Sequence, residues 1–496
     1  MRTQSITRRW FIGGATAFGA LGGCRLLHAP SSFKAGDVPR LRFGVVSDIH
    51  VRLGNTETFE HALEYFRDNG VDAVAVCGDM SDVGLICDLE SVAATWRRVF
   101  PGGRAPDGRK VERLFLYGNH DWEGYHYSKG KIVRSLFWSD EDMRSQLLCS
   151  DYARNWERVF EEPFSPIWTK EVNGYRFVGA HWIADGDVNN VSCNGVCEKF
   201  NPIVRDYYAQ HAREIDPSLP FFHLQHPHPK DTCYGAWAWG RDDGLTTAAL
   251  SSFPNAIALS GHSHYSLTDE RSVWQGAFTS VGTSSLRYGS MTYGQNAPVG
   301  FENAGATGEN AEALNAAKLM ESMETGDCRQ GMLWSVYDDC IVIRRREFVS
   351  DLDLEGTWVL PLPAAESKPF AFVERAKKIR PARFALGAKL SVEFTKARNR
   401  KGDERAVLNV VIPPPLPDVY ARAFLFEVTV HATDGKKHTK LVQAEGYNQA
   451  LAHRRAKEVT TCPFAVDMLG IAPYSISVTP IDCFDQRGEP LLAEYR

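Results

Sequence analysis

Five short polar runs, each placed directly after a short apolar stretch, constrain the fold of this chain more than any other feature. The apolar stretches are residues 41–46, 71–77, 114–117, 221–224 and 256–259. They are rich in Val, Leu and Phe and are separated by long mixed segments, which is typical of buried strands in an α/β fold. Each polar run is therefore expected at the carboxyl end of a strand, the edge at which open α/β sheets bind ligands.

The polar runs offer nitrogen and oxygen ligands for metal ions. They are Asp48-Ile49-His50, Gly78-Asp79, Gly118-Asn119-His120-Asp121, His226 and Gly261-His262-Ser263-His264. Histidine, aspartate and asparagine without thiolates form a set that suits Zn, Fe or Mn ions acting as Lewis acids. There are enough side chains for two ions about 3.5–4 Å apart with a carboxylate between them. The runs therefore predict a binuclear transition-metal site.

Taken in order, the five runs resemble the motifs of the calcineurin-like metallophosphoesterase superfamily, over roughly residues 41 to 345. The resemblance implies an α/β fold, a sandwich of two mixed β-sheets flanked by helices. It also implies hydrolysis of phosphoester bonds through attack by a metal-bound hydroxide. The ligands that it implies are Asp48, His50 and His264 for one ion, Asn119, His226 and His262 for the other, and Asp79 as the bridge.

Three residues of these runs, and Asp82 three residues after Asp79, have further expected roles. His120 matches a histidine that is not a ligand and that protonates the leaving group or stabilises the transition state. Asn119 is expected to help neutralise charge on the phosphoryl oxygens, besides binding metal. Asp82 and Asp121 match supporting positions and are expected to orient ligands without binding metal themselves.

The fourth run leaves two histidines open as the ligand. It reads Gln225-His226-Pro227-His228-Pro229, and the family often shows His-His-Pro or His-x-Pro at this place. His226 is preferred because it comes first after the apolar stretch. His228 is the alternative.

Loops around the motifs are expected to select the substrate, because the motifs occur across many activities. Trp237 and Trp239 lie close to Arg241, so the rings would stack on a flat or sugar-like group while the arginine binds a phosphate. Packing of the same rings onto the core is the alternative. The formal net charge of −5 over 496 residues gives no basic footprint for nucleic acid. A phosphoester is the expected substrate, and the motifs do not choose between monoesters, diesters and pyrophosphate bonds.

The amino terminus resembles an export signal. Residues 7–12, Thr-Arg-Arg-Trp-Phe-Ile, resemble the twin-arginine motif, and the uncharged stretch 10–23 is shorter than the about 20 residues that span a membrane. Residues 21–24 resemble a lipobox, in which Cys24 would carry a lipid anchor, and cleavage without lipidation is the alternative. We therefore expect residues 1–24 to be a signal and the protein to reach the periplasm or cell envelope.

Beyond about residue 347 the pattern of the sequence changes. A proline-containing connector is followed by segments 424–431 and 474–479, in which apolar residues alternate with period two, as in half-buried strands. We predict a phosphoesterase domain at residues 40–347, a linker at 348–369 and a small all-β domain resembling fibronectin type III at 370–496.

Overall fold

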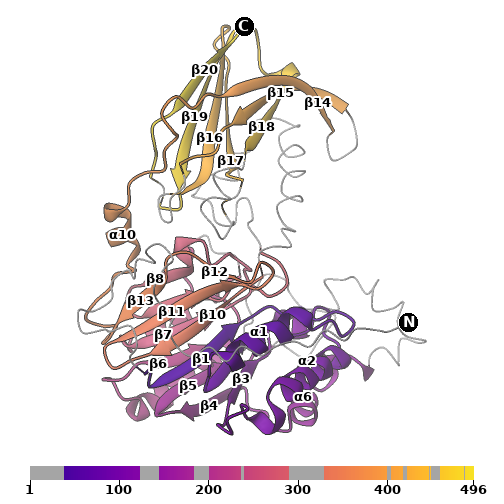
Figure 1. Ribbon diagram of the computed structural model, residues 1–496, viewed down its shortest axis with the longest axis vertical. Helices are drawn as coiled ribbons and strands as arrows, with labels where there is room; N and C mark the ends of the chain where they lie inside the picture. Colours follow the sequence, from indigo (N-terminus) through magenta and orange to yellow (C-terminus); the bar gives the residue numbers. More distant parts are fainter. Residues whose placement is uncertain are drawn as a thin grey trace, which may run out of the picture.

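The structure, a computed structural model, describes residues 38–122, 145–183, 200–235, 240–289, 329–398, 404–416, 422–445, 447, 459–484 and 486–496. Figure 1 shows two parts that follow one another along the long axis: an α/β part at the start of the chain and an all-β part at its end. The predicted signal at residues 1–24, with Cys24, and the two tryptophans Trp237 and Trp239 lie outside the described residues.

The first sheet carries the first three polar runs. Its order is β12-β11-β10-β1-β2-β3, and β13 also pairs with β11. The strands are β1 (Leu41–Val46), β2 (Ala73–Cys77), β3 (Glu112–Leu116), β10 (Gln330–Val336), β11 (Cys340–Glu347), β12 (Leu352–Asp353) and β13 (Trp358–Pro361). Strands β1, β2 and β3 are parallel, with Val45 beside Ala75 and Ala75 beside Leu114. Their carboxyl ends therefore meet at one edge.

The second sheet carries the last two polar runs. Its order is β4-β5-β6-β7-β9-β8. The strands are β4 (Ile167–Val172), β5 (Tyr175–Ala180), β6 (Phe221–Leu224), β7 (Ala256–Ser260), β8 (Val273–Gln275) and β9 (Thr279–Gly282). Strands β5, β6, β7 and β9 are parallel to one another, while β4 and β8 are antiparallel edge strands.

The two sheets pack face to face and helices cover their outer faces. Phe43 of the first sheet contacts Phe177 and Phe222 of the second, with ring centroids 5.3 and 4.9 Å apart. Helices α1 (Glu57–Asp68), α2 (Ile86–Val99) and α6 (Tyr152–Phe160) share a core with the outer face of the first sheet, and α7 (Phe200–His211) and α8 (Leu245–Leu250) share one with the second. The predicted sandwich of two mixed sheets flanked by helices is confirmed.

Helix α1 shows why these segments become covering helices. Its buried residues Phe59, Ala62, Leu63 and Phe66 follow the i, i+3, i+4, i+7 spacing of one apolar helix face. Short 3₁₀ segments complete the described helices: η1 (Pro101–Gly103), η2 (Leu148–Ser150), η3 (Ala212–Glu214), η5 (Glu270–Ser272) and η7 (Val466–Met468). Among the described residues, no helix combines the length and the apolar character that crossing a membrane requires.

The segment predicted as a linker, residues 348–369, instead extends the first sheet. Within it, β12 and β13 both pair antiparallel with β11. Helix α10 (Phe372–Lys378) then leads to the all-β part.

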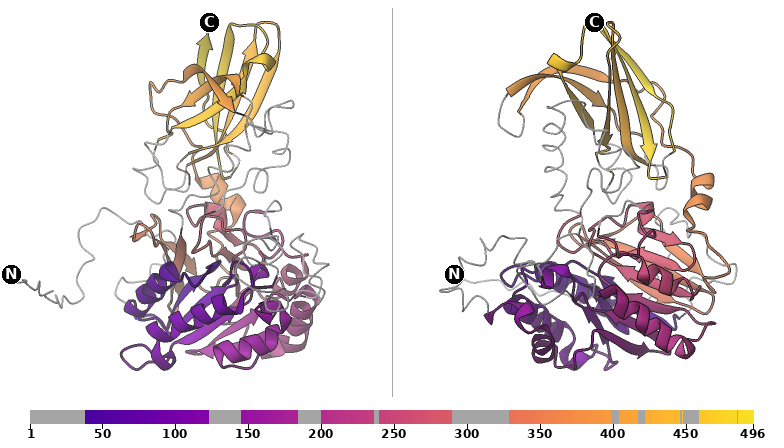
Figure 2. Two further views of the ribbon diagram at one scale, coloured as in Figure 1. Left: turned by 90° about the vertical axis from the view of Figure 1, so that its right-hand side faces the viewer. Right: turned by 180° about the vertical axis from the view of Figure 1, so that it is seen from behind.

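The carboxyl-terminal part is all-β, as predicted. Strands β14 (Ser391–Arg398), β15 (Glu404–Ile412) and β18 (Thr460–Ala465) form one antiparallel sheet. Strands β16 (Ala423–Ala432), β17 (Lys437–Gln443), β19 (Tyr474–Asp482) and β20 (Leu491–Tyr495) form the other, in the order β17-β16-β19-β20. Both sheets contribute to one core, to which β16 gives the alternating residues Phe426, Val428 and Val430. Figure 2 shows the two sheets of this part from two further sides.

The two parts meet beside the last polar run. Arg375, of α10, lies 3.2 Å from Glu270 of η5, measured between Nη1 and Oε2. The neighbouring Arg271 places its guanidinium 4.2 Å from the ring centroid of Phe424, in β16. All four side chains are buried. The carboxyl-terminal part is therefore in contact with the segment that follows His264 in the chain.

Candidate metal centre

The five polar runs come together where the carboxyl edges of the two sheets meet. Backbone hydrogen bonds join the loops: Asp48 N donates to the Gly78 carbonyl and Gly261 N to the His226 carbonyl, both at 3.0 Å. The first bond links runs within one sheet and the second links runs within the other. Contacts between their side chains then bring together all seven predicted ligands.

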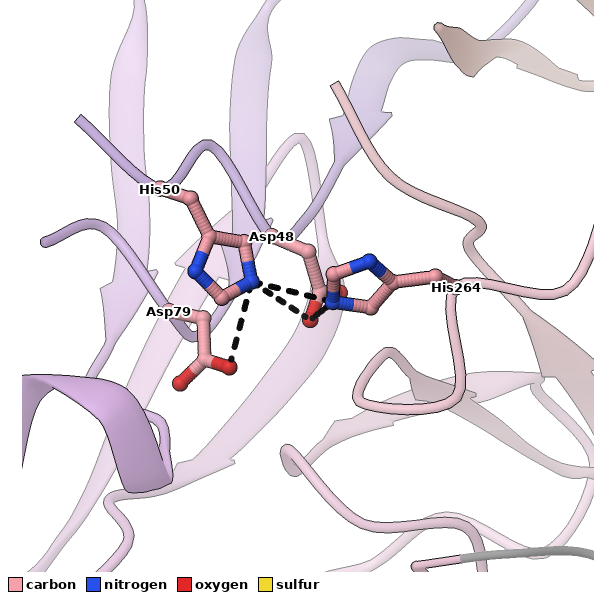
Figure 3. Close-up of side chains that lie close together, drawn as sticks. All are labelled: Asp48, His50, Asp79 and His264. Atoms are coloured by element: carbon pink, nitrogen blue, oxygen red, sulfur yellow. Dashed lines mark hydrogen bonds and ion pairs between the residues drawn. The ribbon is translucent and has the colours of Figure 1, made fainter. Parts of the chain in front are cut away.

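The first group of candidate ligands comprises Asp48, His50, Asp79 and His264. His50 Nε2 lies 2.9 Å from His264 Nε2, 3.8 Å from Asp48 Oδ1 and 3.6 Å from Asp79 Oδ2. Figure 3 shows the two imidazole rings and the two carboxylates pointing toward one another. All four side chains are buried, and their ligand atoms lie within 4.8 Å of one another.

The second group comprises Asp79, Asn119, His226 and His262. His226 Nε2 lies 2.8 Å from Asn119 Oδ1, 3.2 Å from His262 Nδ1 and 3.1 Å from Asp79 Oδ2. The same Asp79 oxygen faces His50 in the first group. Asp79 thus lies between the two groups, where a bridging carboxylate is expected.

The donor atoms fit transition-metal ions. His50 and His264 present ring nitrogens to one another at 2.9 Å, with the Asp48 carboxylate 3.0 Å from His264 Nε2. Two unprotonated nitrogens in this position would repel each other, so a proton or a cation must lie among these atoms. Buried imidazole and carboxylate donors without thiolates suit Zn, Fe and Mn.

Five of the seven candidate ligands have a left-handed backbone. Their φ values are 52° for Asp48, 45° for His50, 53° for Asp79, 70° for His262 and 57° for His264. Positive φ is uncommon outside glycine, and each such residue costs about 1–3 kcal/mol unless the surroundings hold it. This backbone strain on the candidate ligands indicates that the fold of the loops holds their side chains in a fixed direction.

Two motif glycines let the runs pack directly on the ligands. A Cβ atom at Gly118 would overlap the carboxylate and backbone nitrogen of Asp79. One at Gly261 would overlap Ser47 and the Asp48 carboxylate. Both positions therefore require glycine, because the neighbouring run lies too close to leave room for a Cβ atom.

The predicted supporting residues lie where they can orient ligands. Asp82 Oδ1 is 3.2 Å from His50 Nδ1. The other ring nitrogen, Nε2, faces the cluster, by which we mean the seven candidate ligands. The second oxygen of Asp82 accepts a hydrogen bond from Arg52 at 2.7 Å. Asp121 accepts hydrogen bonds from the backbone nitrogens of Gly118 at 2.8 Å and Ser81 at 2.7 Å. Asp82 thus contacts a ligand directly, whereas Asp121 ties the second and third runs together.

The geometry favours His226 over His228 as the fourth-run ligand. His226 Nδ1 donates to the Cys77 carbonyl at 2.7 Å, which leaves Nε2 facing Asp79. His228 uses Nδ1 with Ser260 Oγ and Nε2 with Ser263 Oγ, both at 2.7 Å. His228 therefore supports the loop that carries His262 and His264.

His120 lies beside the first group. Its ring centroid is 4.5 Å from that of His50, nearly perpendicular to it. Its Nδ1 lies 2.8 Å from the Asp82 carbonyl oxygen, which can only accept, so Nδ1 carries a proton. Its backbone nitrogen donates to Asp79 Oδ1 at 2.7 Å. His120 also groups with His50 and Asp82 within ligand distance, so metal content must be measured in any variant at this position.

Other contacts at the site were not predicted from the sequence. Arg52 pairs with Asp82, and the ring of Tyr288 packs on His264 with centroids 4.4 Å apart. Of the predicted substrate residues, Arg241 pairs its backbone with that of His228, so it lies next to the fourth run. In the sequence, only Arg52 could have been suspected, because it lies two residues after His50. The contacts of Tyr288 and Arg241 depend on how distant loops meet in the fold.

Protons occupy the cluster when no metal is bound. Burial alone would lower the pKa of His50, but hydrogen bonds with Asp48 and Asp82 raise it to about 10. Burial would likewise lower the pKa of His226, but the charge of Asp79 raises it to about 9. Burial would raise the pKa of Asp79, yet the charges of His226 and His120 hold it well below its usual range.

We expect metal uptake by the metal-free protein to release protons and to tighten as the pH rises. An imidazole must lose the proton on its ligating nitrogen before it binds metal. The pKa values of His50 and His226, about 10 and 9, keep both rings protonated at neutral pH. The apparent affinity should therefore rise about tenfold per pH unit for each proton released, until the pH passes these values. Calorimetric titration in buffers of different ionisation enthalpy counts the protons, and pH-independent uptake would contradict this account.

Comparison with known proteins supports the family resemblance of the five runs. Residues 41–266 match the family model described as calcineurin-like phosphoesterase, so the resemblance is confirmed over this range. No curated protein matches the chain.

Several solved structures resemble the chain. A dimetal phosphatase from Danio rerio is 12% identical over 64% of this chain and 98% of that chain, with a TM-score of 0.34. GAP50, the anchor in the inner membrane complex of Plasmodium, is 10% identical over 63% of this chain and 86% of that chain, with a TM-score of 0.34. Vps29 complexed with Zn²⁺ from Entamoeba histolytica is 10% identical over 65% of this chain and 99% of that chain, with a TM-score of 0.28.

Proposed function

We propose that this protein is a hydrolase of phosphoester bonds that works with two transition-metal ions, Mn, Fe or Zn. The observation that carries the proposal is the position of Asp79 Oδ2, 3.6 Å from His50 Nε2 in one ligand group and 3.1 Å from His226 Nε2 in the other. A carboxylate shared between two such groups suits a two-metal hydrolase. The family match over residues 41–266 supports the same chemistry.

Asp48, His50 and His264 would hold one ion, Asn119, His226 and His262 the other, with Asp79 between them. Such ions, when bound, act as Lewis acids on phosphoryl oxygens and lower the pKa of water from about 16 to about 7. The chain itself supplies rigid positioning. Both oxygens of Asp48 accept from the backbone nitrogen of His262, at 3.2 and 3.1 Å, and Asp82 orients His50. Ligands held in this way need little reorganisation during the reaction.

His120 is the residue that we assign to the leaving group. Its hydrogen bond to the Asp82 carbonyl fixes the orientation of the ring, and the proton on Nδ1 leaves Nε2 as the nitrogen that exchanges a proton with substrate. Burial lowers the pKa of His120, an effect that the charge of Asp79 opposes. A proton held on Nε2 is therefore given up readily. Donation of this proton to the departing alkoxide is general acid catalysis, and a hydrogen bond from Nε2 would stabilise the same alkoxide.

The test is an assay of the purified protein, loaded with Mn or Zn, against phosphomonoesters, cyclic and linear diesters and nucleotide sugars. We expect turnover of at least one class and its loss after metal chelation. Preference for a diester or a pyrophosphate bond would favour those hydrolases over a monoesterase. Binding of metal without turnover of any ester would favour the rival assignment, a non-catalytic metal-retaining protein of the cell envelope. Elemental analysis that finds no metal in active protein would overturn the proposal.

We also propose that the protein is exported to the periplasm or cell envelope, with Cys24 as a candidate lipid anchor. The support is the sequence alone: Arg8 and Arg9 precede an uncharged stretch that ends near Cys24. Changing both arginines to lysine should retain the protein inside the cell, because a receptor reads that pair. Fractionation followed by immunoblotting measures this. Unchanged export of the double variant would contradict the twin-arginine assignment.

Cys24→Ala separates lipidation from simple cleavage. Each buried methylene of an attached acyl chain contributes about 0.8 kcal/mol to membrane binding, so an acylated protein stays with the membrane. If Cys24 is acylated, the variant should move to the soluble envelope fraction. If the signal is only cleaved, wild type and variant should both be soluble.

A further inference from the structure

Tyr288 lies against two of the candidate ligands. Its ring centroid is 4.4 Å from that of His264 and 6.1 Å from that of His50. The residue is half-buried, and its ring packs on these two candidate ligands. Tyr288 therefore borders the end of the site formed by Asp48, His50 and His264.

The loop that carries Tyr288 is tied to the first polar run. Leu286 N donates to the Ser47 carbonyl at 3.1 Å, and Ser285 Oγ donates to the Asp48 carbonyl at 2.9 Å. The same Ser285 hydroxyl accepts from Tyr288 N at 3.3 Å. The position of the tyrosine is thus coupled directly to the backbone of a ligand, as a residue that touches substrate requires.

Tyr288 and His120 both pack on His50. The His120 ring lies 4.5 Å from His50, and the Tyr288 ring lies 6.1 Å from it. His120 is the residue assigned to the leaving group, so Tyr288 neighbours the same candidate ligand as that residue.

The Tyr288 hydroxyl is available as a donor. Within the described part of the chain it makes no hydrogen bond, whereas its backbone nitrogen does. A tyrosine phenol, with an ordinary pKa of about 10, carries its proton at neutral pH and can donate a hydrogen bond. A neutral donor beside the metal ligands suits a phosphoryl oxygen that the metals leave unbound.

We propose that Tyr288 contacts the substrate and donates a hydrogen bond from its hydroxyl to a phosphoryl oxygen. The inference rests on the proposed phosphoesterase function and adds a specific phosphate-binding residue to it. The alternative is that the ring only packs on His264 and shields that ligand from solvent.

Tyr288→Phe distinguishes the two roles because it keeps the ring and removes the hydroxyl. We expect kcat/KM to fall by about 3- to 10-fold, as the loss of one neutral hydrogen bond predicts. The inhibition constant of inorganic phosphate should rise by the same factor, while metal content stays unchanged. Tyr288→Leu, which removes the ring as well, should lose at least as much phosphate affinity. Tyr495→Phe is the matched control, since Tyr495 packs on Phe394 in the carboxyl-terminal part.

Phosphate binding to the metal-loaded protein, followed by calorimetry, keeps this test separate from the test of turnover. If no ester is hydrolysed but phosphate binds more weakly to Tyr288→Phe, the phosphoesterase proposal fails and the phosphate contact stands. Unchanged phosphate affinity and unchanged kcat/KM in Tyr288→Phe would overturn the contact. Loss of metal in that variant would also overturn it, because Tyr288 would then be holding ligands in place.

Discussion

Asp79→Asn should lose bound metal and reduce activity by about 10³-fold or more. The Asp79 carboxylate faces His50 in one ligand group and His226 in the other, so one substitution weakens both. An amide is neutral and bridges two cations poorly. Lewis-acid stabilisation by bound metal is worth several kcal/mol, and each 1.36 kcal/mol corresponds to about a tenfold change in rate. Elemental analysis and kcat/KM with the best substrate of the panel measure the two effects.

The fold should survive this substitution. Asn retains an oxygen that can accept the hydrogen bond from His120 N, now 2.7 Å from Asp79 Oδ1. Asp482→Asn is the matched control, because Asp482 is also buried, in β19, and accepts hydrogen bonds from the backbone nitrogens of Phe484 and Gln486. The control should keep full metal content. Normal metal content in Asp79→Asn would show that the shared carboxylate does not bridge two ions.

The strands that carry the polar runs could be predicted closely from the sequence. The apolar stretches 41–46 and 221–224 coincide with β1 and β6, because each ends abruptly at a polar run that marks the sheet edge. Which sheet each strand joins could not be predicted in this way. A buried parallel strand has the same apolar composition in either sheet, so only the pairing of β1 with β2 and of β6 with β7 reveals the division.

The sequence pattern does not predict β12 and β13, the first two strands after residue 347. Strand β13, Trp358–Pro361, ends in proline and lies among further prolines, so it resembles a connector. An edge strand tolerates proline because some of its backbone N–H groups face away from the sheet. Pairing with β11, earlier in the chain, makes β13 a strand, and no local signal predicts that pairing.

The candidate ligands could be predicted because side-chain chemistry and order along the chain are both visible in a sequence. Their left-handed backbone and the contact of Tyr288 with His264 could not, because both arise from loops that meet only in the folded chain. The choice of His226 over His228 is intermediate. Its place after the apolar stretch favoured it, and the two serines that occupy His228 give the physical reason.

His120→Ala should slow the hydrolysis of alkyl phosphate esters by about 10²–10⁴-fold while metals stay bound, the range typical of a positioned proton donor. An alkoxide is a poor leaving group and needs the proton that His120 supplies. A nitrophenolate leaves without protonation, so the nitrophenyl ester should lose much less. The dependence of kcat/KM on the pKa of the leaving group therefore becomes steeper in the variant. This change in slope separates proton donation from a general loss of structure.

A histidine away from the candidate ligands provides the control for His120→Ala. His211, half-buried at the end of α7 and hydrogen-bonded to Glu214 at 2.9 Å, is not one of the candidate site residues, so His211→Ala should leave both slope and metal unchanged. An equal loss for alkyl and nitrophenyl esters in His120→Ala would mean that His120 stabilises charge on phosphorus and does not protonate the leaving group. Loss of metal would instead make His120 a ligand, together with His50 and Asp82, which lie within ligand distance of it. The distinction matters because His120 Nδ1 is occupied by the Asp82 carbonyl, so Nε2 is the nitrogen that must serve whichever role is found.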